Sequence, residues 1–127
     1  MKKTPLRRKS KSKRRKLIDK ADRALQDFYR TQGLVCEVCG KPMNVVHHYF
    51  PKNQSSYLRF KKENLVPICT SCHFKHHRTG DPTIHDTIKQ KRGQKWLDDL
   101  VHDFHDNHGH KLSDEYLIKQ IEKYDTT

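Results

Sequence analysis

Four cysteines form two pairs with the spacing of metal-binding knuckles. Two residues separate Cys36 from Cys39 and Cys69 from Cys72, and 29 residues lie between the pairs. Four thiolates in this arrangement can close a tetrahedral zinc site, which stabilises a fold but leaves no position open for chemistry. A redox pair or unpaired buried thiols are the alternatives, although a thioredoxin-like site needs one CxxC within a β-α-β pattern. We therefore expect a structural zinc ion that joins the two ends of the intervening segment.

A second set of residues that could do chemistry is rich in histidine. His47 and His48 follow a short β-prone run, and His73 comes directly after the second cysteine pair. His77 lies four residues after His73, so both fall on one face of a helix. Two imidazoles at this spacing and one from an adjacent strand could form an open metal site with room for water or a phosphate oxygen. Any one of the ten histidines taken alone is more simply a solvated side chain, and only the joint spacing favours a site.

Short strands and helices must position these residues. β-prone runs precede the first cysteine pair, the double histidine and the second cysteine pair, and a polar stretch over residues 51–64 separates the last two. Histidines at helical spacing after Cys72, followed by Gly80 and Pro82, predict one short helix. The other predicted helices cover about residues 16–31, the surroundings of Ile84, residues 96–104 and the segment after Ser113. This order predicts a small α+β fold, flanked by an N-terminal helix and C-terminal helices.

The composition leaves room for only a small core. Of 127 residues 32% are hydrophobic, and 27 lysines and arginines against 15 acidic residues give a net charge of +12. A chain this short and polar needs a staple such as a bound metal. No apolar run approaches the roughly 20 residues of a membrane helix, and no signal peptide is visible. We expect one cytoplasmic domain over residues 16–127, with a core motif at 34–80 and a helical extension at 81–127.

Most of the excess charge lies at the start of the chain, where residues 1–16 hold ten lysines and arginines and no acid. An arm over residues 1–15 is expected to be disordered when free, because it cannot bury enough surface to offset the entropy of ordering it. Nucleic acid is the expected partner, since neutralising phosphates releases counterions. No membrane partner is expected, because the arm has no apolar face. A solubilising or import-like tail is the remaining alternative.

The order CxxC, HH, N, CxxCH and H over residues 34–80 resembles the HNH nuclease motif. That motif implies a β-hairpin followed by a helix around one divalent ion, the ββα-metal finger. The stretch HHYFPKNQSSYLRFKKENLVPICTSC more narrowly resembles the phage recombination endonucleases of the NinG/Rap type, which resolve branched DNA. The segment after Cys72 departs from that group, because CHFKHH is closer to the general HNH pattern.

The resemblance assigns roles to the residues of the motif. It makes His48 the general base and His47 a metal ligand, and alternation of side chains along a strand allows the two to face opposite sides. It makes Asn64 a catalytic-site residue that braces the loop holding His48. The alternative interpretation of Asn64 is a turn residue that follows Lys61, Lys62 and Glu63.

The same resemblance makes His73 and His77 the remaining ligands of the catalytic ion. His76 is ranked below His77, because only His77 shares the helical face of His73. Magnesium is expected from its cellular availability, while ligation by imidazole favours Mn²⁺, Ni²⁺ or Zn²⁺.

These inferences together predict an HNH-type DNA endonuclease, phage-encoded in a bacterial host and acting in recombination on branched DNA such as a Holliday junction. The alternative substrate is linear duplex DNA, which the enzyme would cut in restriction, homing or packaging. A non-catalytic zinc-knuckle module and a zinc-stabilised interaction protein are the alternative classes, and a homodimer is considered for a junction-cutting enzyme. The expected DNA contacts are Lys52, Arg59, Lys61, Lys62, Lys75, Arg78, Arg7, Arg8, Arg14 and Arg15.

Overall fold

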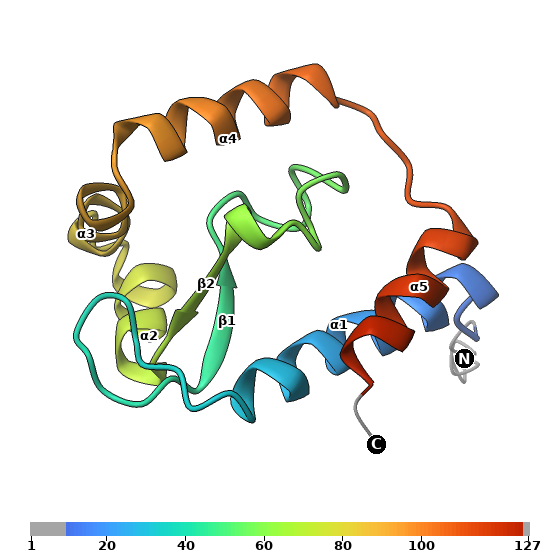
Figure 1. Ribbon diagram of the computed structural model, residues 1–127, viewed down its shortest axis with the longest axis horizontal. Coiled ribbons are helices and arrows are strands. Elements are labelled where there is room, and N and C mark those ends of the chain that lie inside the picture. Colours follow the sequence, from blue (N-terminus) through green and yellow to red (C-terminus); the bar gives the residue numbers. More distant parts are fainter. Residues whose placement is uncertain (1–9, 126–127) are drawn as a thin grey trace, which may run out of the picture.

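The centre of the molecule is a two-stranded antiparallel hairpin followed by a helix. The computed structural model describes residues 10–125. Strand β1 (Val45–His48) pairs with β2 (Leu65–Ile68), and helix α2 (Thr70–Thr79) follows β2 almost directly. Figure 1 shows the hairpin in the middle of the molecule, with the helices arranged around it. This hairpin-and-helix unit confirms the predicted α+β fold and is consistent with an HNH ββα finger.

The hairpin has only two strands, so side chains and loops must provide hydrogen-bond partners for the backbone groups on its two outer edges. Val46 lies opposite Pro67, and the N–H and C=O of Val46 point away from β2. The side-chain amide of Gln26 bonds both of these groups, at 2.8 and 3.0 Å. Pro67 has no N–H to leave unpaired, and its carbonyl accepts from the N–H of Glu37. Both edges of the hairpin are therefore closed by neighbouring segments.

Helix α1 (Lys13–Arg30) and helix α5 (Asp114–Tyr124) pack against each other. Figure 1 shows them side by side along one edge of the molecule, although they come from opposite ends of the chain. Each begins with a serine cap: the Ser12 side chain accepts from Arg15 N–H, and that of Ser113 accepts from Tyr116 N–H.

The start of α1 differs from the predicted end of the basic arm. Residues 13–15 are helical rather than part of a disordered segment. The Ser12 cap explains the early start, as does Asp19, which pairs with Lys11 and Arg15 across the first turns. Residues 1–9 of the predicted arm lie outside the described part of the chain.

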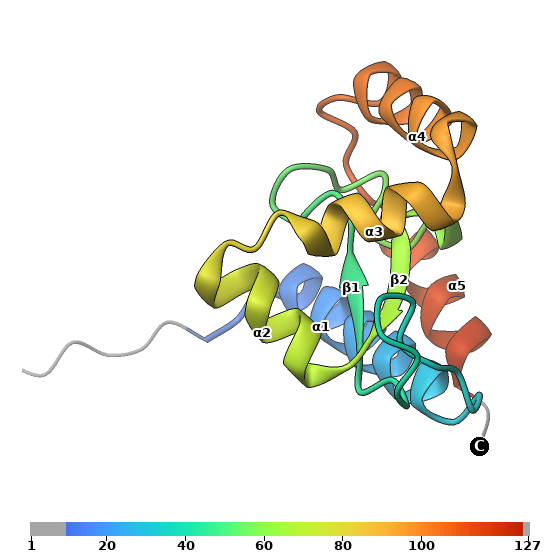
Figure 2. The same cartoon turned by 90° about the vertical axis from the view of Figure 1, so that its left-hand side faces the viewer.

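Helices α3 (Thr83–Arg92) and α4 (Gln94–Asp106) continue the chain beyond α2. Gly80 ends α2 with a φ of 64°, and Gly93, with a φ of 96°, separates α3 from α4. These positive φ values suit glycine, which has no Cβ to clash. Figure 2 shows α3 crossing the hairpin on the side opposite α1. The predicted helices after the motif are confirmed.

Two small clusters form the core, one on each side of the hairpin. On the first side α1, α5 and one face of the hairpin bury Leu25, Val46, Leu65 and Leu117. On the second side Val66, Ile68 and the cysteines pack with Ile84 and Ile88 of α3. Among the described residues no helix is both long and apolar enough to cross a membrane.

Candidate active site

The four cysteines lie together where the ends of the hairpin meet the start of α2. The sulfur atoms of Cys36, Cys39, Cys69 and Cys72 all lie within 4.8 Å of one another, and no disulfide joins them. Burial and the neighbouring thiols raise the pKa of the Cys72 thiol well above its ordinary value. Closely packed thiols of this kind fit a tetrahedral zinc ion, which would hold them as thiolates. The cluster could therefore bind zinc at the position that the sequence predicts.

The side chains of His47 and His48 point to opposite sides of the hairpin. His47 lies opposite Val66, which belongs to the core on the α2–α3 side, while His48 lies opposite Leu65 on the α1 side. Alternation along a strand gives this division. Both histidines still line one cavity of about 250 Å³, together with His73 and His77 of α2.

Three imidazoles converge beside this cavity. The ligand nitrogens of His47, His73 and His77 lie within 4.8 Å of one another. The ring centroid of His47 is 5.5 Å from that of His73 and 5.4 Å from that of His77, and the last two are 4.3 Å apart. Burial and then the neighbouring imidazoles lower the pKa of His47 to about 2, and burial also lowers the pKa of His73. Neutral imidazoles are the form that binds metal, so this donor set fits a divalent ion.

His48 is buried and oriented by the backbone. Its Nε2 lies 2.8 Å from the carbonyl oxygen of Arg59. Because a carbonyl only accepts, Nε2 carries the proton, and Nδ1 keeps the lone pair in the neutral ring. Burial lowers the pKa of His48 to about 4, although the bond to Arg59 acts in the opposite direction. At neutral pH this imidazole is uncharged and able to take a proton.

Asn64 joins the two ends of the loop that holds His48. It is fully buried, and its Oδ1 accepts from the N–H of Phe50 at 2.7 Å. Its Nδ2 donates to the carbonyls of Phe50 and Leu58, at 3.0 and 3.2 Å. Leu58 immediately precedes Arg59, whose carbonyl orients His48. The Asn64 side chain thus links the segment after His48 to the segment whose Arg59 carbonyl contacts His48.

A residue of α1 also supports this loop. The carboxylate of Asp22 pairs with the guanidinium of Arg59 through two hydrogen bonds, one of them 3.0 Å long. The Arg59 side chain is only 12% exposed. The guanidinium of Arg59, which the sequence predicts as a DNA contact, therefore forms an ion pair with α1 inside the protein. Asp22 and Gln26 were not predicted as site residues, since neither belongs to a motif.

Sequence reasoning also missed His85 of α3. Its Nε2 lies 2.9 Å from Nε2 of His47, and its ring stacks between the rings of Tyr49 and His76. The only local signal at this position was the helical spacing of Ile84 and Ile88 on either side. His76, which the sequence ranked below His77, forms a separate three-nitrogen group with His47 and His85.

The other expected DNA contacts fall into three groups. Lys52 lines the cavity, 3.8 Å from Asp22. Exposed or half-buried basic residues without a buried ion pair are Lys61, which lies over the ring of Tyr57, and Lys62, Lys75 and Arg78. On α1, Arg14 donates to the carbonyl of Leu112 and Arg15 pairs with Asp19, while Arg7 and Arg8 lie outside the described residues.

Comparison with known proteins gives the class of this site. The family model for HNH endonuclease matches residues 36–79, which are less than half of the chain and contain both cysteine pairs and the histidines of β1 and α2. This match supports a nuclease of the HNH type in general.

A more particular similarity is limited to a short segment. Over 47 residues, 34% of this chain, the sequence is 47% identical to a protein named mitochondrial DNA mismatch repair protein mutS homolog from Sarcophyton glaucum. The matched segment spans 5% of that relative's length. No solved structure matches the chain.

Proposed function

We propose that this protein is a metal-dependent endonuclease that hydrolyses DNA phosphodiester bonds, and that branched DNA is its preferred substrate. The observation that carries the proposal is the single cavity that His47, His48, His73 and His77 line together. A zinc-knuckle binding module would need the cysteines and the basic residues but would not need this set of imidazoles.

His48 acts as the general base. Its protonated Nε2 is held by the Arg59 carbonyl, so Nδ1 is the atom that takes the proton of the attacking water. Asn64 and the Asp22–Arg59 pair hold the loop that supplies this carbonyl. These contacts keep the imidazole in one orientation and one tautomer, which a base must have to act on a positioned water.

The remaining residues of the cavity bind the phosphate and the ion. A divalent ion held by His47, His73 and His77 would act as a Lewis acid toward the charge that develops on the phosphate and the leaving oxygen. Lys52 lies at the same cavity with its side chain 44% exposed, where it can pair with a phosphate oxygen. Mg²⁺ is the proposed physiological ion, and the cleavage experiment below compares it with Mn²⁺, Ni²⁺ and Zn²⁺.

Branched DNA is proposed from the NinG/Rap-like stretch between the cysteine pairs, and with it a role in recombination and action as a homodimer on the two symmetric strands of a junction. A similar segment in a relative named for DNA mismatch repair supports DNA as the substrate. No base-reading helix is evident in the described part of the chain, so recognition is proposed to depend on the shape and backbone of the DNA.

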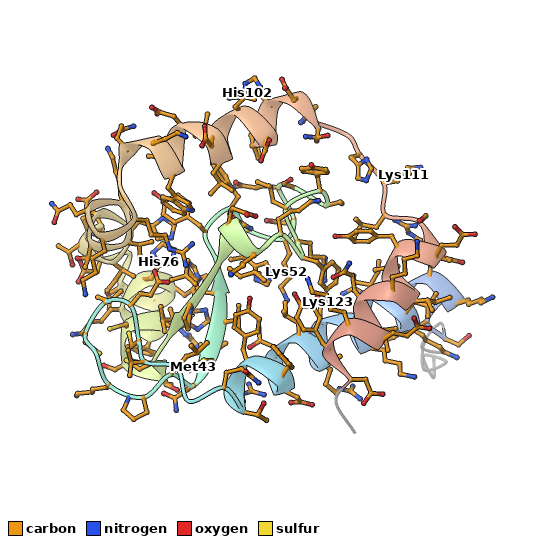
Figure 3. All side chains as sticks on the ribbon, viewed as in Figure 1. Met43, Lys52, His76, His102, Lys111 and Lys123 are labelled. Atoms are coloured by element: carbon orange, nitrogen blue, oxygen red, sulfur yellow. The ribbon has the colours of Figure 1, made fainter. Side chains whose placement is uncertain are left out.

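The test compares wild type and His48→Ala on a synthetic four-way junction and a matched linear duplex, with each divalent ion. Removing a general base lowers the rate by about 10²–10⁴-fold. We expect wild type to cut the junction faster than the duplex, and His48→Ala to lose cleavage while keeping its zinc. The matched control is His102→Ala, because His102 lies on the outer side of α4, far from His76 (Figure 3), and its side chain is 72% exposed.

Each outcome bears on a different part of the proposal. A wild-type protein that cuts neither DNA with any ion, or a His48→Ala variant that still cuts, would show that the enzyme assignment is wrong. Equal cleavage rates on the junction and the duplex would contradict the preference for branched DNA but would still agree with the nuclease proposal. Light scattering of the protein with a junction tests the homodimer separately.

A further inference from the structure

Five imidazoles, not three, gather between the hairpin and helices α2 and α3. They form two three-nitrogen groups that share His47: one with His73 and His77, the other with His76 and His85. In each group the ligand nitrogens lie within 4.8 Å of one another. His85 belongs to α3 and lies beyond residues 36–79, so the HNH match does not include it.

The second group brings its three ligand nitrogens close together, and the planes of its His76 and His85 rings lie 13° apart in a stack. Its ring centroids are 4.9 Å apart for His47 and His76, 5.1 Å for His47 and His85, and 4.1 Å for His76 and His85. An imidazole nitrogen lies about 2.0–2.1 Å from zinc, which places the centres of rings around one ion about 4–5.5 Å apart. The first group spans the same range, from 4.3 to 5.5 Å. Both groups therefore enclose a space of about the size that one ion requires, and the His76 ring of the second group must turn out of its stack with His85 for its lone pair to point at the ion that His47 and His85 share.

Helix α3 is held rigidly enough to fix the position of His85. Ile84 and Ile88, on either side of His85, are buried in the core beneath the hairpin. Arg92 at the end of α3 pairs with Glu37 and donates to the carbonyl of Leu65 at 2.8 Å. The His85 ring itself stacks on Tyr49 with a centroid distance of 4.2 Å. A ligand nitrogen supported in this way is already in place before an ion binds.

The two groups differ in their surroundings. His73 and His77 line the cavity together with His48 and Lys52, whereas His76 and His85 do not line it. An ion held by the second group would thus lie away from the proposed base and from the lysine that would bind phosphate.

We propose that His47, His76 and His85 form a second, non-productive position for a divalent transition-metal ion. The two positions cannot be filled together, because a neutral imidazole has one lone pair and His47 can serve one ion at a time. A donor set made only of imidazole selects borderline ions such as Zn²⁺, Co²⁺ and Ni²⁺. An ion in the second position withdraws His47 from the cavity and competes with productive binding. The inference rests on the proposed function only in taking the His73–His77 group as the productive position.

The test is a Co²⁺ titration, without DNA, of protein whose cysteine cluster is loaded with zinc, with bound ions counted by equilibrium dialysis. Wild type should bind one Co²⁺, since the positions share His47. The His73→Ala/His77→Ala variant should still bind one, with a Kd within about tenfold of wild type, because three imidazoles remain. Adding His85→Phe keeps an aromatic ring in the stack but removes a ligand nitrogen. It should weaken Co²⁺ binding by more than about 100-fold, which exceeds the loss expected if His85 only supported a ligand without binding the ion.

The matched control adds His102→Ala in place of His85→Phe and should bind like the double variant. A double variant that binds no Co²⁺, a His85→Phe effect below about 100-fold, or two Co²⁺ per wild-type chain would overturn the proposal. A second readout needs no third substitution: NMR signals of the His76 and His85 rings in the double variant should shift on addition of Zn²⁺, and unchanged signals would contradict the site. Since no step uses DNA, failure here is distinct from failure of the nuclease assignment.

Discussion

Asn64 shows how much of the site depends on a single buried amide. Its side chain makes three hydrogen bonds to the backbone of the loop around His48 and is fully enclosed. A buried amide is favourable only when its donors and acceptor are all paired, and here they are. The side chain is therefore a brace for the loop around His48, and it does not line the cavity with the histidines.

Replacing this amide by a carboxyl tests the brace. Asn64→Asp keeps an oxygen for the Phe50 N–H but sets its second oxygen against the carbonyls of Phe50 and Leu58. We expect a loss of about 2–3 kcal/mol in the free energy of unfolding, measured by urea denaturation. Cleavage should fall while DNA affinity changes little. Asn53→Asp, exposed in the same loop, should stay within about 0.5 kcal/mol of wild type, and an equal loss there would contradict the assignment.

At the scale of elements, helix α1 completes a hairpin that is too small to support its own residues. Gln26 closes the free edge of β1, and Arg30 donates to the carbonyl of Asn44 just before that strand. Asp22 anchors the loop through Arg59. Asp22, Gln26 and Arg30 all lie outside the segment matched by the HNH model. The orientation of His48 therefore depends on a helix outside the motif.

The Asp22–Arg59 pair gives a test of this dependence. Asp22→Ala leaves the largely buried guanidinium of Arg59 without its partner, and should destabilise the protein by about 1–3 kcal/mol. Because the Arg59 carbonyl orients His48, kcat should fall more than KM rises. Asp27→Ala removes a neighbouring, exposed pair with Arg30 and should cost under about 0.5 kcal/mol. Unfolding curves and steady-state cleavage measure both, and an unchanged kcat in Asp22→Ala would contradict the positioning role.

The whole molecule consists of two small cores separated by a hairpin, and the cysteine cluster is part of one of them. Cys36, Cys69 and Cys72 are buried with Val66 and Ile84, so the cluster joins the loop before β1 to the start of α2. A core of this size contributes little surplus stability. A structural zinc ion in a small domain can supply about 10–16 kcal/mol of apparent binding free energy at neutral pH.

Loss of one thiolate should therefore unfold the domain. Cys69→Ser is expected to lower the zinc content measured by elemental analysis and to abolish the cooperative thermal transition, and strong chelation of wild type should do the same. His108→Ser, an exposed substitution outside both clusters, is the control and should melt like wild type. A zinc-free Cys69→Ser protein that still melts cooperatively would contradict a structural metal.

Local chemistry determined what could be predicted from the sequence alone. The cysteine spacing, the cap at Ser113, the stop at Gly80 and the i, i+4 pair of His73 and His77 are short-range patterns, so the elements and the first histidine group follow from them. The division of His47 and His48 between two sides also follows, because it depends only on strand alternation.

Only the tertiary structure decided which distant side chains complete the site. His85, Gln26 and Asp22 come from helices on both sides of the motif, and nothing in their neighbouring residues marks them. The packing of α1 and α3 against the hairpin brings these residues to the site, and the same packing pairs Arg59, an expected DNA contact, with Asp22. Local sequence encodes the elements, whereas contacts between elements depend on how buried apolar faces pack, which no short pattern contains.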